Sequence, residues 1–169
     1  MTATIALLRA INVGGTGKLS MSELKAMAEE LGFANARTYI ASGNLLFDTD
    51  LTEAAVKARV EKRLADYAGK PLGVLVRTAA EMARVAAKNP FADQPGNRVV
   101  AIFLDGQPPK SALTDHRHFI DERIALGARE IYVHYPSGQG TSRLIIPAGK
   151  AGTARNLNTV TRLAELAAG

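Results

Sequence analysis

The 169-residue chain contains no cysteine and no tryptophan, and only 5% of its residues are aromatic. The lack of cysteine excludes disulfides, thiolate zinc sites and cysteine nucleophiles. The shortage of aromatic side chains argues against a nucleic-acid reader that stacks bases on its surface. No apolar run approaches the roughly 20 residues of a membrane span. The apolar start from Ile5 to Leu8 is closed by Arg9 and is too short for a signal-peptide core, so a soluble cytoplasmic protein is expected.

The remaining composition is typical of a folded domain with a basic surface. Hydrophobic residues make up 47% of the chain and charged residues 22%, and the formal net charge is +5. A chain of this length removes roughly 70% of its surface from water on folding, so its core needs no disulfide or metal. The excess of Lys and Arg favours an anionic partner, either a small molecule or, alternatively, a nucleic acid.

The first half of the chain predicts a ferredoxin-like unit. Ser20 and Glu23 have the spacing of a capping box, which predicts a helix start there, and Gly32 is a suitable helix end. Ser42-Gly43-Asn44 has the composition of a tight turn between two strands, so Gly43 is expected to adopt a positive φ. Strands are predicted at 4–10, 36–41, 45–49 and 72–77, and a second helix at 52–68. This order, βαββαβ, is that of the ferredoxin-like unit.

The second half predicts a related α+β arrangement. Helices are expected at 79–88, 111–119 and from about 153 to 167, and strands at 98–104, 123–126 and 130–135. A clear last strand is missing from this pattern, and the repetition rests on element order alone. The predicted fold class is therefore α+β, with a ferredoxin-like half at 1–78 and a second α+β half at 79–169 closely packed on the first.

The Gly-rich segment from Arg9 to Lys18 is a candidate anion site. It is not a Walker A loop, because that motif needs Gly in place of Asn12 and Ser or Thr in place of Leu19. Three glycines, one lysine and a following helix N-terminus can nevertheless hold an anion. The alternative is that the glycines only turn the chain from strand to helix.

Side chains that could carry chemistry are few. Ser42 has no neighbouring base in sequence to activate it as a nucleophile, and a hairpin turn is the favoured interpretation of its motif. His116, His118 and His134 do not have the spacing of metal ligands. No catalytic residue can be identified from spacing, so whether the protein is an enzyme stays open, and no cofactor or metal is predicted.

The placement of charge is more informative than its sum. No Asp or Glu occurs between Ile131 and Ala164, a stretch that holds Arg143, Lys150, Arg155 and Arg162. Residues 1–22 are also free of acidic residues. If these two stretches meet in the fold they form a positive concavity that attracts an anion, and otherwise they form a diffusely basic surface.

Several motifs of this chain resemble a bacterial family catalogued as domain of unknown function 1697. They are Leu7-Leu8-Arg9-Ala10-Ile11-Asn12-Val13-Gly14-Gly15, then Glu30-Leu31-Gly32-Phe33, Thr38-Tyr39-Ile40-Ala41-Ser42-Gly43-Asn44-Leu45-Leu46-Phe47 and Thr153-Ala154-Arg155-Asn156-Leu157-Asn158-Thr159-Val160. The resemblance covers essentially the whole chain and implies a fold of ferredoxin-like halves, but no established reaction. It implies recurring polar positions at Arg9, Asn12, Gly14, Gly15, Ser42, Gly43, Asn44, Arg155, Asn156 and Thr159.

This chain departs from the family pattern at two places. Leu157 stands where members usually carry Trp, and Pro147 and Gly149 interrupt a segment that is helical in relatives. A ligand contact made by that Trp or that helix would be altered here.

The predicted ligand is a small anion such as a nucleotide or a phosphorylated metabolite. Arg155 and Asn156, expected at the start of the last helix, are predicted to face Asn12 and Gly15. In a competing interpretation, Arg155 pairs with a carboxylate such as Glu165 or Asp48 and only stabilises the fold. The alternatives to a small-anion binder are a nucleic-acid-binding module and a protein–protein interaction or structural domain. The predicted ligand-binding set is Arg9, Asn12, Gly14, Gly15, Lys18, Ser42, Asn44, Arg155 and Asn156.

Overall fold

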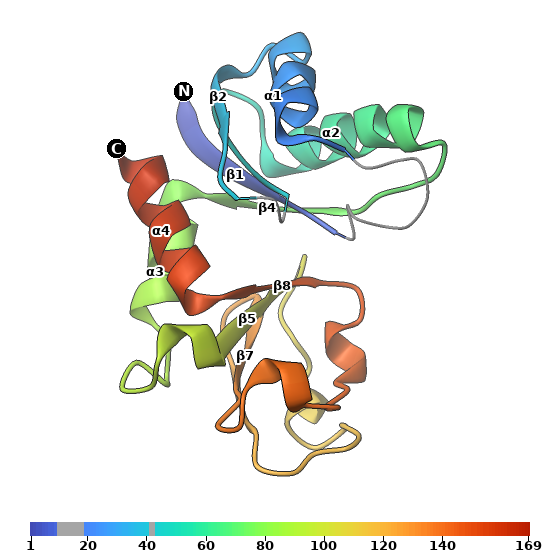
Figure 1. The fold of residues 1–169 in the computed structure, drawn as a ribbon. Coiled ribbons are helices and arrows are strands. Elements are labelled where there is room, and N and C mark those ends of the chain that lie inside the picture. Colours follow the sequence, from blue (N-terminus) through green and yellow to red (C-terminus); the bar gives the residue numbers. More distant parts are fainter. Residues whose placement is uncertain (10–18, 41–42) are drawn as a thin grey trace. The chain divides into compact units, whose positions relative to one another are not determined.

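The computed structural model describes residues 1–9, 19–40 and 43–169 of the chain, which form two compact units (Figure 1). The first unit comprises Met1–Glu81 together with Glu165–Gly169, and the second comprises Met82–Ala164. Each unit contains a four-stranded sheet. The protein is therefore an α+β protein, as its sequence predicts.

The first sheet has the predicted ferredoxin-like topology. Its strands are β1 (Thr2–Leu8), β2 (Ala34–Thr38), β3 (Asn44–Thr49) and β4 (Val74–Thr78). They lie in the order β2-β3-β1-β4, and every neighbouring pair is antiparallel. The helices α1 (Met21–Glu30) and α2 (Glu53–Ala68) cover the same face of this sheet (Figure 1). The four strands and two helices expected from the first half are confirmed.

Local side-chain bonds determine where these helices begin. The Ser20 hydroxyl accepts a hydrogen bond from the Glu23 backbone N–H at 3.1 Å, which confirms the helix start predicted from the capping box. Thr52 caps α2 in the same way, accepting from the Ala55 N–H at 3.2 Å. The helices then bury their apolar faces against the sheet, in a core that includes Leu24, Met27, Val56, Val60, Leu64, Ala6, Leu8, Leu45, Phe47 and Val74.

The second sheet repeats the strand order of the first. Its strands are β5 (Val99–Phe103), β6 (Arg123–Leu126), β7 (Glu130–His134) and β8 (Thr153–Asn156), in the antiparallel order β6-β7-β5-β8. The expectation that this half lacks a last strand is wrong. Residues 153–156 do not open the last helix but pair with β5, and the helix α4 runs over Leu157–Ala168. Pairing with an open sheet edge outweighs the weak strand propensity of Ala and Asn here.

The helices of the two halves differ. The helix expected at 111–119 is wrong, because only a 3₁₀ turn at Lys110–Leu113 forms there. Thr114, Asp115 and two histidines follow that turn, and none of these residues favours a helix interior. The connection from β7 to β8 likewise contains only the 3₁₀ turns Gln139–Thr141 and Pro147–Gly149.

One face of the second sheet is therefore covered by loops and 3₁₀ turns instead of a pair of long helices. The core on this face includes Val100, Leu104, Ala112, Ile131, Val133, Tyr135 and Ile146. On the opposite face, the Tyr132 hydroxyl donates to the Val85 carbonyl of helix α3 (Ala79–Ala87) at 2.7 Å. Within the described ranges, no helix has the length and apolar character needed to cross a membrane.

Candidate functional site

Two of the predicted ligand-binding residues in the first unit have clear structural contacts. Arg9 donates its backbone N–H to the Gly73 carbonyl at 2.9 Å, and a Cβ added at Gly73 would lie 3.0 Å from Arg9 Cδ. Asn44 is fully buried, and its side-chain amide donates to the Tyr39 carbonyl at 3.0 Å. Asn44 therefore links the first residue of β3 to Tyr39, the residue that follows β2. The predicted residues Asn12, Gly14, Gly15, Lys18 and Ser42 lie outside the described residues.

The backbone around this turn is constrained. Gly43 has a φ of +80°, which confirms its predicted conformation, and its carbonyl accepts from the Leu8 N–H at 2.9 Å. Ile40, just before the turn, has a φ of +49° although it is β-branched, a conformation that costs on the order of 1–3 kcal/mol. The contacts between the two strands therefore impose this turn conformation.

Arg155 and Asn156 lie at the end of β8 in the second unit. Arg155 is 8% exposed, and its Nη1 donates to the Thr153 hydroxyl at 2.8 Å and to the Ala154 carbonyl at 2.9 Å. Burial lowers the pKa of Arg155 to about 10, so the side chain remains a cation at neutral pH. The Asn156 side-chain oxygen accepts from the Thr159 N–H at 2.9 Å, as an N-cap residue does at the start of α4. The predicted approach of Arg155 to Asn12 and Gly15 concerns residues outside the described ranges.

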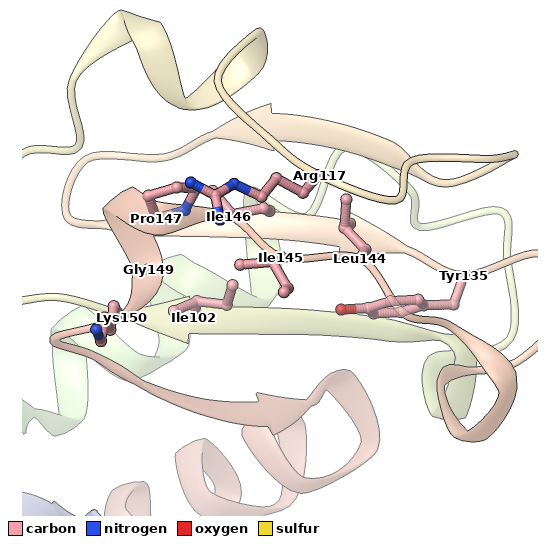
Figure 2. A pocket seen from close by; sticks show the side chains of 9 residues that line it. All are labelled: Ile102, Arg117, Tyr135, Leu144, Ile145, Ile146, Pro147, Gly149 and Lys150. Carbon is pink, nitrogen blue, oxygen red and sulfur yellow. The ribbon is translucent and has the colours of Figure 1, made fainter.

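The second unit also contains a groove that the sequence did not predict. Its volume is about 480 Å³, and it lies against the sheet face that carries no long helices (Figure 2). The floor comes from β5 and the residue after β7, and the walls come from the β5–β6 and β7–β8 connections. The groove is lined by Ile102, Arg117, Tyr135, Leu144, Ile145, Ile146, Pro147, Gly149 and Lys150.

A backbone bridge joins the two connections that wall the groove. Arg117 donates its N–H to the Ile145 carbonyl at 2.9 Å, and Ile145 donates back to Arg117 at 3.0 Å. Gly149 allows the β7–β8 connection to approach the sheet, because a Cβ at Gly149 would lie 3.3 Å from Ile102 Cδ1. The groove is thus held on both sides by contacts that do not depend on a helix.

A buried carboxylate fixes the same two connections at their other end. Glu122 is 3% exposed and accepts from the Ile120 N–H at 2.8 Å and from the Ser142 hydroxyl. The Ser142 oxygen in turn accepts from the Leu144 N–H at 3.2 Å. Burial by itself raises the pKa of Glu122, but the bonds from Ser142 and from the nearby backbone N–H groups outweigh it and leave the pKa below its usual value. Glu122 is therefore charged at neutral pH, and it holds the Ser142 hydroxyl that accepts from Leu144 beside the groove.

Tyr135 separates the groove from a smaller cavity. Its ring lines both the groove and a space of about 80 Å³ beside Glu122. Burial and, secondarily, the charge of Glu122 raise the pKa of the Tyr135 phenol, so the hydroxyl stays a hydrogen-bond donor at neutral pH. The hydroxyl points along the groove toward Ile145 and Ile102 (Figure 2).

Charge is distributed unevenly along the groove. Figure 2 shows Lys150 and the guanidinium of Arg117 toward the end formed by Pro147 and Gly149, with Tyr135 at the other end and Ile102 and Ile145 between them. Among the described lining residues there is no carboxylate and no histidine. Across the described parts of the chain, no three His, Asp or Glu side chains gather as metal ligands. Such a groove can bind an anion that carries an apolar body.

Sequence patterns indicated only part of this site. The acid-free stretch from Ile131 to Ala164 contains Lys150, and Pro147 and Gly149 stand where the family resemblance implies a helix. Arg117 and Tyr135 carry no such signal, because only the bridge between the two connections brings Arg117 to the groove. The nearest available indication was the lack of helical periodicity between β7 and β8.

Comparison with known proteins gives a family and a fold. A family model described as "Protein of unknown function (DUF1697)" matches residues 1–132, whereas most residues that line the groove lie beyond that range. The solved structure of the conserved bacterial protein SP0830 from Streptococcus pneumoniae is similar, with a TM-score of 0.80, 22% sequence identity and 98% of each chain covered. At that identity the likeness concerns the fold alone. No curated protein matches the chain significantly.

Proposed function

Because the chain belongs to the DUF1697 family of proteins of unknown function, its activity has to be inferred from its own residues, and we propose that it binds a small organic anion in the second-unit groove. The observation that carries the proposal is the lining of that groove. An aliphatic centre is flanked by Arg117 and Lys150, and among its described lining residues no carboxylate opposes a negative ligand.

The chemistry of these groups defines the ligand class. A guanidinium can bind a phosphate or carboxylate through two parallel hydrogen bonds, and an ammonium adds a point charge. Contacts with Ile102 and Ile145 favour methylene groups, each worth about 0.8 kcal/mol when buried. A nucleotide or phosphorylated metabolite with an apolar part therefore suits the groove better than a bare sugar phosphate. For n-hexyl phosphate, a probe of about eleven heavy atoms, we expect a Kd on the order of 0.1–1 mM.

Other proposals from the sequence remain beside this one. The turn from Arg9 to Lys18, with Asn12, Gly14 and Gly15, is a second proposed anion site. Binding of nucleic acid and a purely structural or protein-binding role have no specific contact in their favour, and catalysis stays open. A cytoplasmic location likewise stays a prediction.

Isothermal titration with n-hexyl phosphate tests the proposal, with glucose 6-phosphate as the polar comparison. We expect hexyl phosphate to bind more tightly, and Arg117→Gln and Lys150→Gln each to weaken it roughly tenfold, which corresponds to about 1.4 kcal/mol. The control is Arg143→Gln, because Arg143 lies in the same acid-free stretch, is exposed and does not line the groove. An unchanged Kd is expected for that variant.

Equal losses in all three variants, or no effect in any, would refute binding in the groove. If a single-stranded oligonucleotide instead binds with an affinity that falls steeply with salt, and Arg143→Gln weakens it as much as Arg117→Gln, the nucleic-acid alternative is favoured.

A further inference from the structure

We infer that Tyr135 selects among anions of this class, favouring ligands that carry a hydrogen-bond acceptor at the end remote from the negative charge. This inference rests on the proposed function and specifies its ligand. The ligand would have an anionic group, an apolar middle and an ether, ester or carbonyl oxygen near its other end.

The first support is the state of the Tyr135 hydroxyl. The residue is 9% exposed, and its hydroxyl forms no hydrogen bond with residues 1–9, 19–40 and 43–169. Within those ranges His134 Nδ1 is the buried polar atom without a partner, so the Tyr135 oxygen is accessible from the groove and open to a ligand. Tyr132, three residues earlier on the same chain segment, shows the usual arrangement by donating to the Val85 carbonyl. A ligand oxygen in the groove would satisfy Tyr135 in the same way.

The second support is that the hydroxyl does not bond to the neighbouring carboxylate. The oxygens of Glu122 accept from the Ile120 N–H and from the Ser142 hydroxyl, and Tyr135 is not among the groups that bond to it. The Tyr135 hydroxyl instead points along the groove (Figure 2). Its raised pKa keeps the proton on the phenol at neutral pH, so the hydroxyl can donate to an acceptor on a ligand.

The third support is the anchored backbone of Tyr135. The Tyr135 backbone donates to the Arg98 carbonyl at 2.8 Å and accepts from the Gly138 N–H at 2.9 Å, which anchors the residue at both sides. Little ordering is then needed when a ligand binds. Because the hydroxyl and the cationic side chains lie at opposite ends of the groove (Figure 2), one ligand can reach both only if its polar groups are separated by an apolar segment.

Two series of probes test this selection. The first consists of n-alkyl phosphates from butyl to octyl, and the second replaces one methylene near the free end by an ether oxygen, which is similar in size and accepts a hydrogen bond. Titration calorimetry gives the ratio of the Kd of the alkyl probe to that of its ether partner at each length. At the best-fitting length, we expect Tyr135→Phe to lower this ratio about tenfold, because the variant removes the hydroxyl that donates to the ether oxygen and keeps the ring.

The control is Tyr67→Phe, a matched change at an exposed residue of the first unit, which should leave the ratio unchanged. If Tyr135→Phe leaves the ratio unchanged while Arg117→Gln weakens both series, the selection is refuted and the proposed function stands. If neither series binds, or if Arg117→Gln affects neither, the proposed function and this inference both fail. Should Tyr135→Phe not fold, the wild-type protein decides alone, because an equal affinity for both series at every length overturns the inference.

Discussion

The hydrogen bond from Ser142 to Glu122 offers a quantitative test of how the walls of the groove are held. Ser142→Ala removes one donor to a carboxylate that is 3% exposed, and it also removes the acceptor of the Leu144 N–H. A hydrogen bond to a charged group is worth about 1.5–3 kcal/mol. We therefore expect Ser142→Ala to lower the free energy of unfolding at pH 7 by about 2 kcal/mol, which for a chain of this size lowers Tm by about 4–8 °C.

The stability lost in Ser142→Ala should depend on pH in a defined direction. The bonds from Ser142 and the backbone lower the pKa of Glu122 in the folded protein, whereas the unfolded chain has a value near 4.3. A lowered carboxyl pKa contributes stability that is fully present above the unfolded pKa and is lost as pH falls through the folded pKa. Ser142→Ala raises the folded pKa of Glu122. The difference between variant and wild type is therefore largest above about pH 5 and shrinks toward pH 3.

Urea unfolding followed by circular dichroism at pH 7 and at pH 3.5 measures both effects. The matched control is Ser137→Ala, because Ser137 donates to the exposed carboxylate of Asp121 at 2.7 Å, and such a surface bond is worth less than about 0.5 kcal/mol. A destabilisation by Ser142→Ala below 0.5 kcal/mol, or one of equal size at both pH values, would refute the role given to Glu122.

Three further predictions concern other parts of the second unit. Gly152→Ala should lower the free energy of unfolding in urea by about 2–4 kcal/mol, because the added Cβ would clash with the backbone oxygen of Phe103 in β5. Gly106→Ala is the control: an added Cβ there has no atom within 4 Å, so its free energy of unfolding should change by less than about 0.5 kcal/mol. Asn156→Ala should cost about 1 kcal/mol in the same assay through loss of the α4 cap, and an unchanged stability would show that the cap contributes nothing. His134→Phe should be neutral or stabilising in thermal unfolding, because within the described part of the chain His134 Nδ1 is buried without a hydrogen-bond partner; a loss above about 1 kcal/mol would contradict this.

The first half could be predicted from sequence because its signals are local. The cap at Ser20 and the turn at Gly43 involve residues a few positions apart, and the apolar period of the second helix is regular. The second half contains fewer such signals. β8 forms because the edge of β5 is available to it, which no pattern within residues 153–156 reveals. The helix expected at 111–119 does not form, because the 3₁₀ turn at Lys110–Leu113 is followed by polar residues that do not favour a helix.

The candidate site was less predictable than the fold. Asn44 and Asn156 are among the polar positions that the family resemblance implies, and both form hydrogen bonds with the backbone that the sequence does not distinguish from ligand contacts. The groove depends on Arg117 meeting Ile145 across 28 positions of the chain, and on loops in place of the helices that cover the first sheet. Such contacts follow from tertiary packing and leave no periodic pattern.

Mapping of amide chemical shifts during titration of the ¹⁵N-labelled protein with n-hexyl phosphate tests the anion-binding groove most directly. If the anion binds in the groove, we expect the largest saturable shifts at the backbone amides of Ile102, Ile145 and Lys150, with a common Kd on the order of 0.1–1 mM. Saturable shifts confined to residues 1–81, or none at any amide of the groove up to 10 mM ligand, would contradict the assignment of the anion site to the second unit.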